Sequence, residues 1–216
     1  MSQPLIEEII LRPDYWDEAT DSLMAQDRVL RRLIPQFPSI HLASRGNPFL
    51  TLARSIVGQQ ISVKAAESVW QRTLICCAQD PNPQKFLSLE ESALRQAGLS
   101  RRKVEYLQDL ARHFVENKVH PALWDEMDDE TVIRELTQIR GIGRWTAEMF
   151  LIFFLLRPDV LPLDDVGLLR AISKHYYSGE PVSRFDAREV AQAWVPWRTV
   201  ATWYLWRSLD PVPVEY

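Results

Sequence analysis

The chain has 216 residues, with 25 Lys and Arg against 29 Asp and Glu, so its formal net charge at pH 7 is −4. This length fits one large domain or two small ones, and 46% hydrophobic with 25% charged residues is typical of a folded globular protein. The two cysteines, Cys76 and Cys77, are adjacent, which excludes a disulfide framework, a four-thiolate zinc site and a four-cysteine iron–sulfur cluster.

The longest apolar run, residues 149–156, is far shorter than the roughly 20 residues that span a bilayer, so we expect no membrane partner. The N-terminal residues are acidic before any apolar stretch, and we therefore expect a cytoplasmic location. Acidic residues gather in 1–21 and 121–135, which carry −10 together and leave +6 on the rest of the chain. A basic face thus remains compatible with the negative total.

Helical spacing of apolar residues dominates the sequence. Ser62 and Ser100 are predicted to cap two helices, Ser88 and Glu91 to form a capping box, and Gly98 to end the helix that this box opens. The predicted helices cover 63–77, 88–98, 101–117, 129–138, 144–156, 165–176, 187–194 and 197–209. The chain contains neither a convincing alternating run nor an Asn-Gly or Asp-Gly dipeptide, so an all-α fold is predicted.

Two of the seven glycines, Gly141 and Gly143, lie between the predicted helices 129–138 and 144–156. Glycine can adopt positive φ and leaves backbone N–H groups unobstructed, so a Gly-x-Gly turn that opens a helix can bind phosphate. Taken alone, such a turn is more often a tight connection between two core helices. Here Ile139, Ile142 and the small Ala147 frame the glycines.

This frame resembles the helix-hairpin-helix element of a DNA glycosylase superfamily. In that family a catalytic aspartate starts the next helix, in a segment of the form apolar-Pro-x-Asp-Asp. Leu161-Pro-Leu-Asp-Asp165 has this form, and Asp165 follows Gly143 by 22 residues. The resemblance therefore implies that Asp165 is the catalytic acid and that Asp164 is its neighbour at the base pocket. Without the hairpin, the same pair would indicate only a helix cap.

Three further segments resemble the alkylation-repair branch, that of DNA-3-methyladenine glycosylase II. Residues 55–66 are similar to the segment that faces the minor groove, 98–103 to a basic loop, and 194–206 to the C-terminal helix. The DNA-binding residues implied by the hairpin and by these segments are Gly141, Ile142, Gly143, Arg144, Thr146, Gln59, Gln60, Ser62, Arg101, Arg102 and Lys103.

The reaction type depends on position 145. Relatives that also cleave the strand have a lysine there, which forms a Schiff base, whereas this chain has Trp145. The resemblance therefore implies a monofunctional hydrolase that excises alkylated purines after base flipping. Trp145 and Trp206 are the expected walls of the base pocket, because electron-rich indoles stack on cationic purines, and Met149 is expected to line it.

The family resemblance also implies the organisation of the chain. We expect a central helical subdomain over 48–160, with the helix-hairpin-helix at about 129–156, and a second one from 1–47 together with 161–216, with a cleft between them. Double-stranded DNA with alkylated bases is the expected partner of a monomer, at the nucleoid of a bacterium or in a eukaryotic nucleus. No cofactor is required, although Na+ or K+ is expected to bind main-chain carbonyls of the hairpin, by position those of Thr137, Ile139 and Ile142.

Two departures from the family pattern bear on these expectations. Arg140 precedes the first hairpin glycine, where relatives often have proline, and Gln60 stands where a known relative has a leucine wedge. Two other functions stay open from the residues. One is a helix-hairpin-helix module that binds DNA without catalysis, and the other is a glycosylase/lyase for oxidised bases, which Trp145 and the missing cluster cysteines disfavour.

Overall fold

The computed structural model describes residues 12–44 and 46–209, and all regular elements in these ranges are helical, which confirms the predicted all-α class. The α-helices are α1 (Trp16–Gln26), α2 (Arg28–Leu33), α3 (Pro48–Gly58), α4 (Val63–Cys76), α5 (Pro83–Ser88), α6 (Glu91–Gln96), α7 (Arg101–Val115), α8 (Asp129–Leu136), α9 (Arg144–Phe153), α10 (Val166–Tyr176), α11 (Arg184–Ala191) and α12 (Arg198–Arg207). Three short 3-10 helices join them at η1 (Ile34–Gln36), η2 (Pro121–Glu126) and η3 (Gln192–Trp194).

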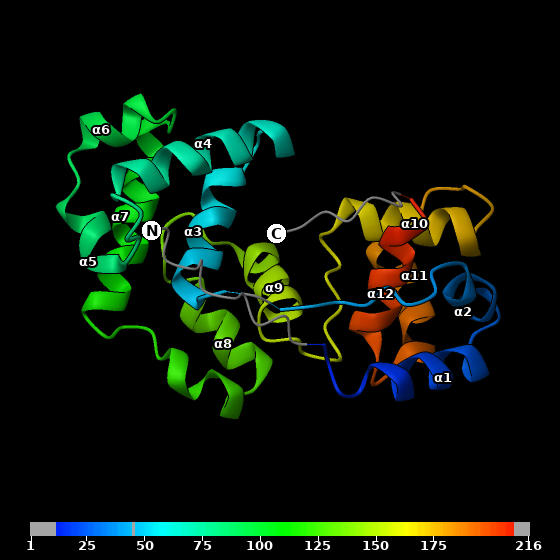
Figure 1. Ribbon diagram of the computed structural model, residues 1–216. Helices are drawn as coiled ribbons and strands as arrows, with labels where there is room; N and C mark the ends of the chain where they lie inside the picture. The colour runs from blue at the N-terminus through cyan, green and yellow to red at the C-terminus, as the bar shows by residue number, and fades with distance from the viewer. Residues whose placement is uncertain (1–11, 45, 210–216) are drawn as a thin grey trace. The chain divides into compact units, whose positions relative to one another are not determined.

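The described residues form two compact units (Figure 1). Unit 1 comprises 12–44 and 151–209, and unit 2 comprises 46–150. The chain passes between the units at 45/46 and at 150/151, whereas the sequence predicted boundaries at 47/48 and 160/161. The second passage falls inside α9, so this helix belongs to both units.

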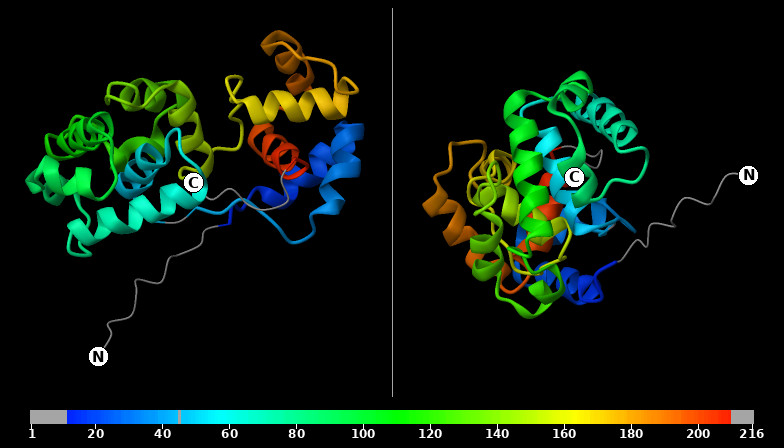
Figure 2. Two further views of the ribbon diagram at one scale, coloured as in Figure 1. Left: turned by 90° about the horizontal axis from the view of Figure 1, so that it is seen from above. Right: turned by 90° about the vertical axis from the view of Figure 1, so that its left-hand side faces the viewer.

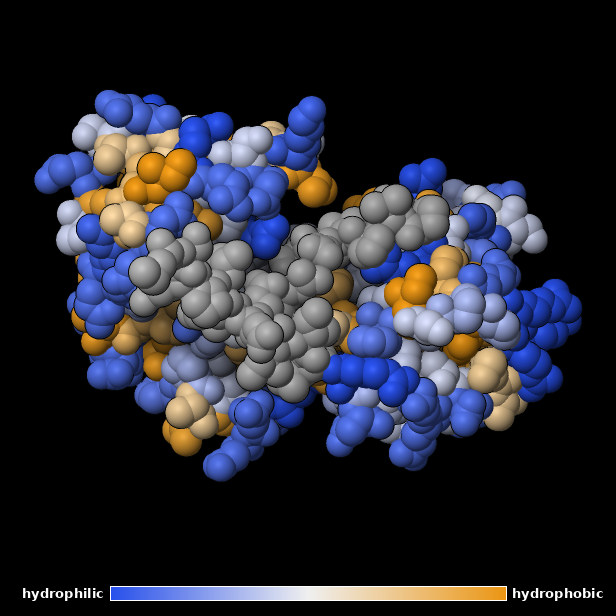
Figure 3. Space-filling view, viewed as in Figure 1, coloured by the Kyte–Doolittle hydropathy of each residue, from blue (hydrophilic) through white to orange (hydrophobic). Residues whose placement is uncertain are grey.

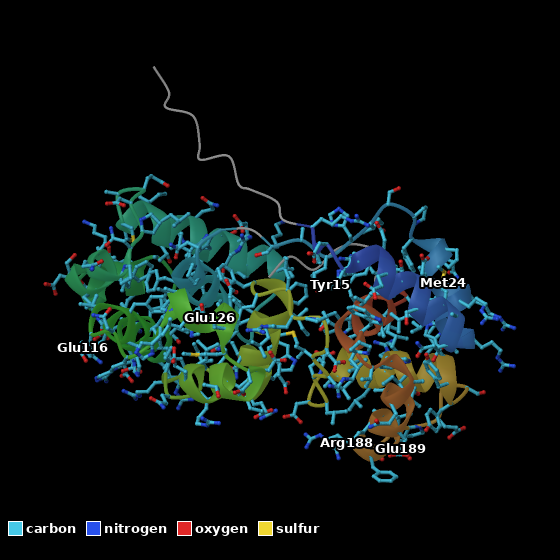
Figure 4. All side chains as sticks on the ribbon, turned by 90° about the horizontal axis from the view of Figure 1, so that it is seen from below. Tyr15, Met24, Glu116, Glu126, Arg188 and Glu189 are labelled. Carbon is cyan, nitrogen blue, oxygen red and sulfur yellow. The ribbon has the colours of Figure 1, made fainter. Side chains whose placement is uncertain are left out.

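Helix α12 lies at the centre of unit 1. It packs against α1, α2 and α10, as the views of Figure 2 also show, and every residue from Thr199 to Leu205 is buried. Helix α11 covers the outer side of α10 with its small residues inward, since Ala187 and Ala191 are buried. Its polar residues point outward, as Arg188 and Glu189 do in Figure 4.

A buried carboxylate joins three helices of unit 1. Asp27 is 7% exposed and caps α2, where its Oδ1 accepts hydrogen bonds from the N–H groups of Val29 (2.7 Å) and Leu30 (2.9 Å). Its Oδ2 accepts from the hydroxyl of Tyr176 on α10 (2.9 Å) and from the indole Nε1 of Trp194 on η3 (3.1 Å). Four donors therefore compensate the burial of one charge.

Unit 2 is built around α7, which packs against α3, α5 and α6. A chain of edge-to-face aromatic contacts runs through its core, from Phe86 to Phe49, Phe114, Trp124 and Phe150, with ring centroids 5.2–6.3 Å apart. Trp124 is fully buried, as expected for a large side chain in the packed interior of a unit.

Local signals predicted most helix starts. The side chains of Ser62 and Ser100 accept from the N–H groups of Ala65 and Lys103, which confirms both caps. The capping box at Ser88 is wrong: Pro83 opens an earlier helix that Ser88 ends, and α6 begins at Glu91 without a side-chain cap. Pro83 is favoured in the first turn of a helix, and it thus determines where this helix begins.

Two other predicted helix bounds need correction. Helix α9 ends at Phe153 rather than at residue 156, and Leu156 has a φ of 53°, outside the helical range. Helix α11 begins at Arg184 rather than at 187, because Ser183 and Asp186 form a capping box there.

The described residues present a mainly hydrophilic surface on the face seen in Figure 3, where hydrophobic residues form small separate groups. Within this described part, every helix falls short of the length and apolarity needed to cross a membrane.

The contacts of Asp27 predict the effect of an isosteric substitution. In Asp27→Asn the amide NH2 replaces one acceptor, so at least one donor in the core loses its partner, and we expect the free energy of unfolding to fall by about 2 kcal/mol. Urea unfolding measures this loss, and Asp21→Asn, at an exposed position on α1, is the control that should match the wild type. An unchanged midpoint for Asp27→Asn would contradict the structural role of this carboxylate.

Candidate active site

Asp165 is the N-cap of α10. Pro162 accepts a turn hydrogen bond from the Asp165 N–H (3.0 Å), and the backbone of Asp165 is extended (φ −80°, ψ 114°). Its carboxylate Oδ1 accepts from the Leu168 N–H at 2.6 Å, and the residue is only 8% exposed. Asp165 is therefore a helix cap, and the helix N-terminus favours the negative charge that the predicted catalytic role requires.

Trp206 holds the same carboxylate oxygen. Its indole Nε1 donates to Asp165 Oδ1 at 2.8 Å, although the two residues are 41 positions apart. Phe153 stacks against the indole with ring centroids 5.8 Å apart and planes inclined by 10°. The structure thus brings together two of the predicted site residues, Asp165 and Trp206. The indole is also held by Phe153, which the sequence did not single out.

Gly167 makes this close approach possible. A Cβ atom at this position would lie 3.0 Å from Asp165 Oδ1 and 3.3 Å from Trp206 Cδ1, which is tighter than ordinary contacts. Because the chain has only seven glycines, a glycine two residues after the predicted catalytic acid was a signal that could have been read from the sequence.

Asp164, the neighbour of the predicted acid, has a different environment. Its side chain is 44% exposed and forms an ion pair with Arg184 at the start of α11 (2.7 Å). Arg184 was not among the predicted site residues. The pair joins the turn before α10 to α11, and the two adjacent aspartates thus have separate partners.

In the Gly-x-Gly turn, Gly141 has the positive φ for which the sequence suggested a glycine, whereas Gly143 does not. The Ile142 N–H donates to the Ile139 carbonyl (3.1 Å), both isoleucines are buried, and Gly141 has a φ of 90°. A Cβ atom on Gly141 would lie 2.2 Å from the ring of Tyr106, so both the conformation and the packing require glycine. Helix α9 starts immediately afterwards, at Arg144.

The α3–α4 turn contacts this hairpin. Gln59 Nε2 donates to the Gly141 carbonyl at 2.8 Å, so the amide of this predicted DNA-binding residue already has a partner in unit 2. Gln60 is exposed and has a φ of 60°, and Ile61 and Val63 beside it are 40% and 67% exposed. Ser62 is occupied as the cap of α4.

Several predicted phosphate-binding cations also have intramolecular partners. Arg144 pairs with Glu130 on α8 and, through Nε, with Glu148 (3.0 Å), and the hydrogen bond with Glu130 raises the pKa of the guanidinium. Lys103 Nζ donates to the Val57 carbonyl (2.7 Å), and burial lowers the pKa of this amine. Of the other two predicted cations, Arg101 pairs with Glu105 at 3.4 Å, and the side chain of Arg102 is exposed.

The remaining predicted residues lie on the part of α9 that belongs to unit 2. Trp145 is half-buried, whereas Thr146 and Met149 are 7% and 4% exposed. In the described ranges, no three His, Cys, Asp or Glu side chains are grouped so that they could hold a metal ion.

The all-helical fold, the Gly-x-Gly hairpin and the buried helix-capping aspartate can be compared with known proteins. Residues 53–196 match the HhH-GPD superfamily of base excision DNA repair proteins. A DNA-3-methyladenine glycosylase 1 from Schizosaccharomyces pombe is 30% identical over 182 residues, which cover 83% of this chain and 80% of that protein.

Two solved structures have the same fold over nearly the whole chain. One is a DNA-3-methyladenine glycosidase from Bacillus halodurans, with a TM-score of 0.83, 36% identity, and coverage of 93% of this chain and 92% of that one. The other is the Schizosaccharomyces pombe 3-methyladenine DNA glycosylase Mag1 in complex with abasic DNA, with a TM-score of 0.78, 28% identity, and coverage of 92% and 98%. The chain belongs to the HhH-GPD superfamily of base excision DNA repair proteins.

The space beside Gly167 predicts a spectroscopic change. In Gly167→Ala the new methyl group crowds Asp165 Oδ1 and the indole, so we expect the Trp206 indole N–H resonance to shift in nitrogen–proton correlation spectra as its hydrogen bond lengthens. Gly58→Ala is the control, because a Cβ atom there meets only the Ala66 Cβ at 3.8 Å. If the Trp206 resonance keeps its wild-type position in Gly167→Ala, the tight packing of this corner is refuted.

Proposed function

We propose that the protein is a monofunctional DNA glycosylase that hydrolyses the N-glycosidic bond of alkylated purines, of the 3-methyladenine and 7-methylguanine type, in duplex DNA. The observation that carries this proposal is the buried Asp165 carboxylate at the start of α10, the second helix after the Gly-x-Gly turn, where the Leu168 N–H and the Trp206 indole both donate to it. The names of the similar proteins, which are 3-methyladenine glycosylases, support the substrate class.

The enzyme must first extrude the damaged nucleotide, because the glycosidic bond is hidden inside the duplex. Extrusion costs a few kcal/mol. Phosphate binding by backbone N–H groups of the hairpin, together with a residue that fills the vacated stack, offsets this cost. Gln60 is our candidate for that residue, because it is exposed and its positive φ places it at the tip of the α3–α4 turn.

Alkylated purines such as 3-methyladenine carry a positive charge and leave with little help from a general acid. The costly part of the reaction is the positive charge that builds on the sugar. An ionised Asp165 beside C1′ stabilises this charge and orients or deprotonates the attacking water. The two donors on Oδ1 suit this role, because an ionised carboxylate only accepts hydrogen bonds.

The base pocket in this proposal uses indole faces. Phe153 packs on one face of Trp206, and we assign the opposite face to the flipped base. A cationic purine on an indole gains about 0.5 to 2 kcal/mol from the cation–π attraction. Trp145 as a second wall and Met149 as a lining residue stay part of the proposal on the strength of their positions after the hairpin.

A monovalent cation at the hairpin is a further part of this proposal. The Ile139 carbonyl accepts the turn hydrogen bond from Ile142 and has a second lone pair for a ligand, which is compatible with cation binding by the carbonyls of Thr137, Ile139 and Ile142. When bound, the cation supplies positive charge beside the hairpin N–H groups, where a phosphate would lie.

A non-catalytic DNA-binding module is the second candidate function. It would use the hairpin in the same way but would have no need for a buried carboxylate fixed by an indole. The close packing of Gly167, Asp165 and Trp206 therefore favours the enzyme.

Asp165→Asn tests the catalytic assignment. Asparagine is an equally good helix cap, so the fold should persist, whereas loss of the charge should slow single-turnover release of 3-methyladenine from methylated duplex DNA by about 10²- to 10³-fold. Asp27→Asn is the matched control, because Asp27 is also a buried cap of unit 1 that accepts from a tryptophan Nε1, yet it should retain release at temperatures where it is folded. Equal release by Asp165→Asn and the wild type would refute the proposal.

Because residue 145 is tryptophan rather than lysine, we expect no Schiff-base intermediate between the enzyme and DNA. Incubation of the wild-type enzyme with alkylated DNA and borohydride should leave no protein–DNA adduct, because an adduct requires an amine that attacks C1′. A known glycosylase/lyase with its own substrate is the positive control. A trapped adduct would identify an amine nucleophile and would make the enzyme bifunctional.

A further inference from the structure

The hairpin turn does not satisfy the backbone N–H groups of its two central residues, Arg140 and Gly141. In the turn from Ile139 to Ile142, the Ile142 N–H closes the ring on the Ile139 carbonyl, and Gly141 is the residue with positive φ. The N–H of Arg140, the second residue of such a turn, lies outside this ring. Its partner is the Asp109 carboxylate, whose Oδ2 accepts from the Arg140 N–H at 2.9 Å.

Asp109 is a buried acid on the inner face of α7. Its side chain is 12% exposed. Arg112 Nη1 lies 3.1 Å from Oδ1, and His113 Nδ1 lies 3.5 Å from Oδ2 and 2.8 Å from the Asp109 carbonyl. Side chains one helical turn further along α7 thus hold the carboxylate, so that Oδ2 stays directed at the hairpin.

Two other residues of α7 contact the same turn. The Tyr106 ring lies against Gly141, and Glu105 Oε2 is 3.4 Å from Nη2 of Arg140. Positions 105, 106 and 109 share one face of the helix. This face of α7 therefore packs against the turn, and among these three residues Asp109 is the one that accepts a hydrogen bond from the turn backbone.

We propose that Asp109 is a positioning residue that fixes the hairpin turn in its DNA-binding conformation from α7. The proposal rests on the proposed function, in which the N–H groups that open α9 bind a DNA phosphate. Proline at the second position of such a turn fixes φ covalently and has no N–H to satisfy. With Arg140 in this place, the turn has a freer φ and an unpaired donor, and the Asp109 hydrogen bond compensates for both.

Binding of undamaged duplex DNA by Asp109→Ala tests this role. We expect the dissociation constant to rise about 10-fold, because the Arg140 N–H is left without its partner and the turn samples other conformations. Asp109→Asn should restore most of the affinity, since its amide oxygen can accept the same hydrogen bond. The slope of log affinity against log salt should not change, because no phosphate-binding cation is removed.

Glu135→Ala is the matched control for loss of stability. Glu135 lies in the same unit, its side chain is also 12% exposed, and it accepts from a backbone N–H, that of His120, and from Trp124 Nε1 (2.7 Å). Its removal should lower the melting temperature as Asp109→Ala does, but should change duplex affinity by no more than about twofold. Equal losses of affinity in both variants would reduce Asp109 to a stabilising residue and would overturn the proposal.

Arg140→Pro gives a second, independent test. In this background the donor is absent and φ is fixed, so adding Asp109→Ala should change the dissociation constant by less than about twofold, against about 10-fold in the wild-type background. If the effect of Asp109→Ala is the same in both backgrounds, the hydrogen bond is not the cause and the proposal fails.

Failure of the glycosylase proposal has a separate signature. If that proposal is wrong, the wild-type protein will release no alkylated base. The comparison of duplex affinities would still test whether Asp109 positions the hairpin turn. With saturating enzyme, single-turnover release by Asp109→Ala should stay within about threefold of the wild type, because Asp165 and its partners lie in unit 1 and are untouched.

Discussion

The hydrogen bond from the Trp206 indole to Asp165 is the interaction on which the candidate site depends. A carboxylate that is 8% exposed has to be compensated by donors, and its donors include an N–H at the start of its own helix and an indole from α12, the central helix of unit 1. The carboxylate is therefore placed by the core of the unit rather than by a loop. This arrangement favours glycine at position 167, since a Cβ atom there would crowd both Asp165 Oδ1 and the indole. A reactive group fixed in this way requires no reorganisation when charge develops near it, which is the property that electrostatic catalysis needs.

The hairpin has a different requirement from the Asp165 carboxylate. In the proposed function its backbone N–H groups have to remain available to bind a DNA phosphate. The turn is held from α7 through Asp109 and Tyr106 and from the α3–α4 turn through Gln59, and all three contacts lie within unit 2. Two of the predicted phosphate-binding cations are engaged elsewhere, Arg144 with two glutamates and Lys103 with a carbonyl. In a chain of net charge −4, DNA binding at this place would thus depend more on the directions of backbone N–H groups than on free positive charge. The affinity for DNA would then depend on the conformation of the turn. This is why Asp109, a buried acid on the neighbouring helix α7, is important.

The parts of this arrangement that are local in sequence could be predicted, and the parts that depend on packing could not. Ser62, Ser100 and Gly141 could be assigned from the sequence because a helix cap or a positive φ depends on only a few neighbouring residues. Asp165 and Trp206 were found through resemblance to a family, but their hydrogen bond joins positions 41 residues apart and has no local signal. The capping box predicted at Ser88 was wrong because Pro83 begins a helix that ends at Ser88. Asp109 sits between the inward-facing Leu107 and Leu110, and an acid in that position was a signal of a buried polar contact, although its partner could not be named from the sequence.

The charge of the damaged base determines how much help its departure needs from a site with a fixed carboxylate. A cationic purine leaves without a proton donor, so a carboxylate beside the sugar and an indole beside the base are sufficient for it. A neutral lesion such as hypoxanthine needs protonation to leave at a comparable rate. At Asp165 the oxygen Oδ1 is engaged as an acceptor of hydrogen bonds from the Leu168 N–H and the Trp206 indole. For an alkylated purine no proton has to be supplied, because the positive charge of the damaged base itself drives its departure.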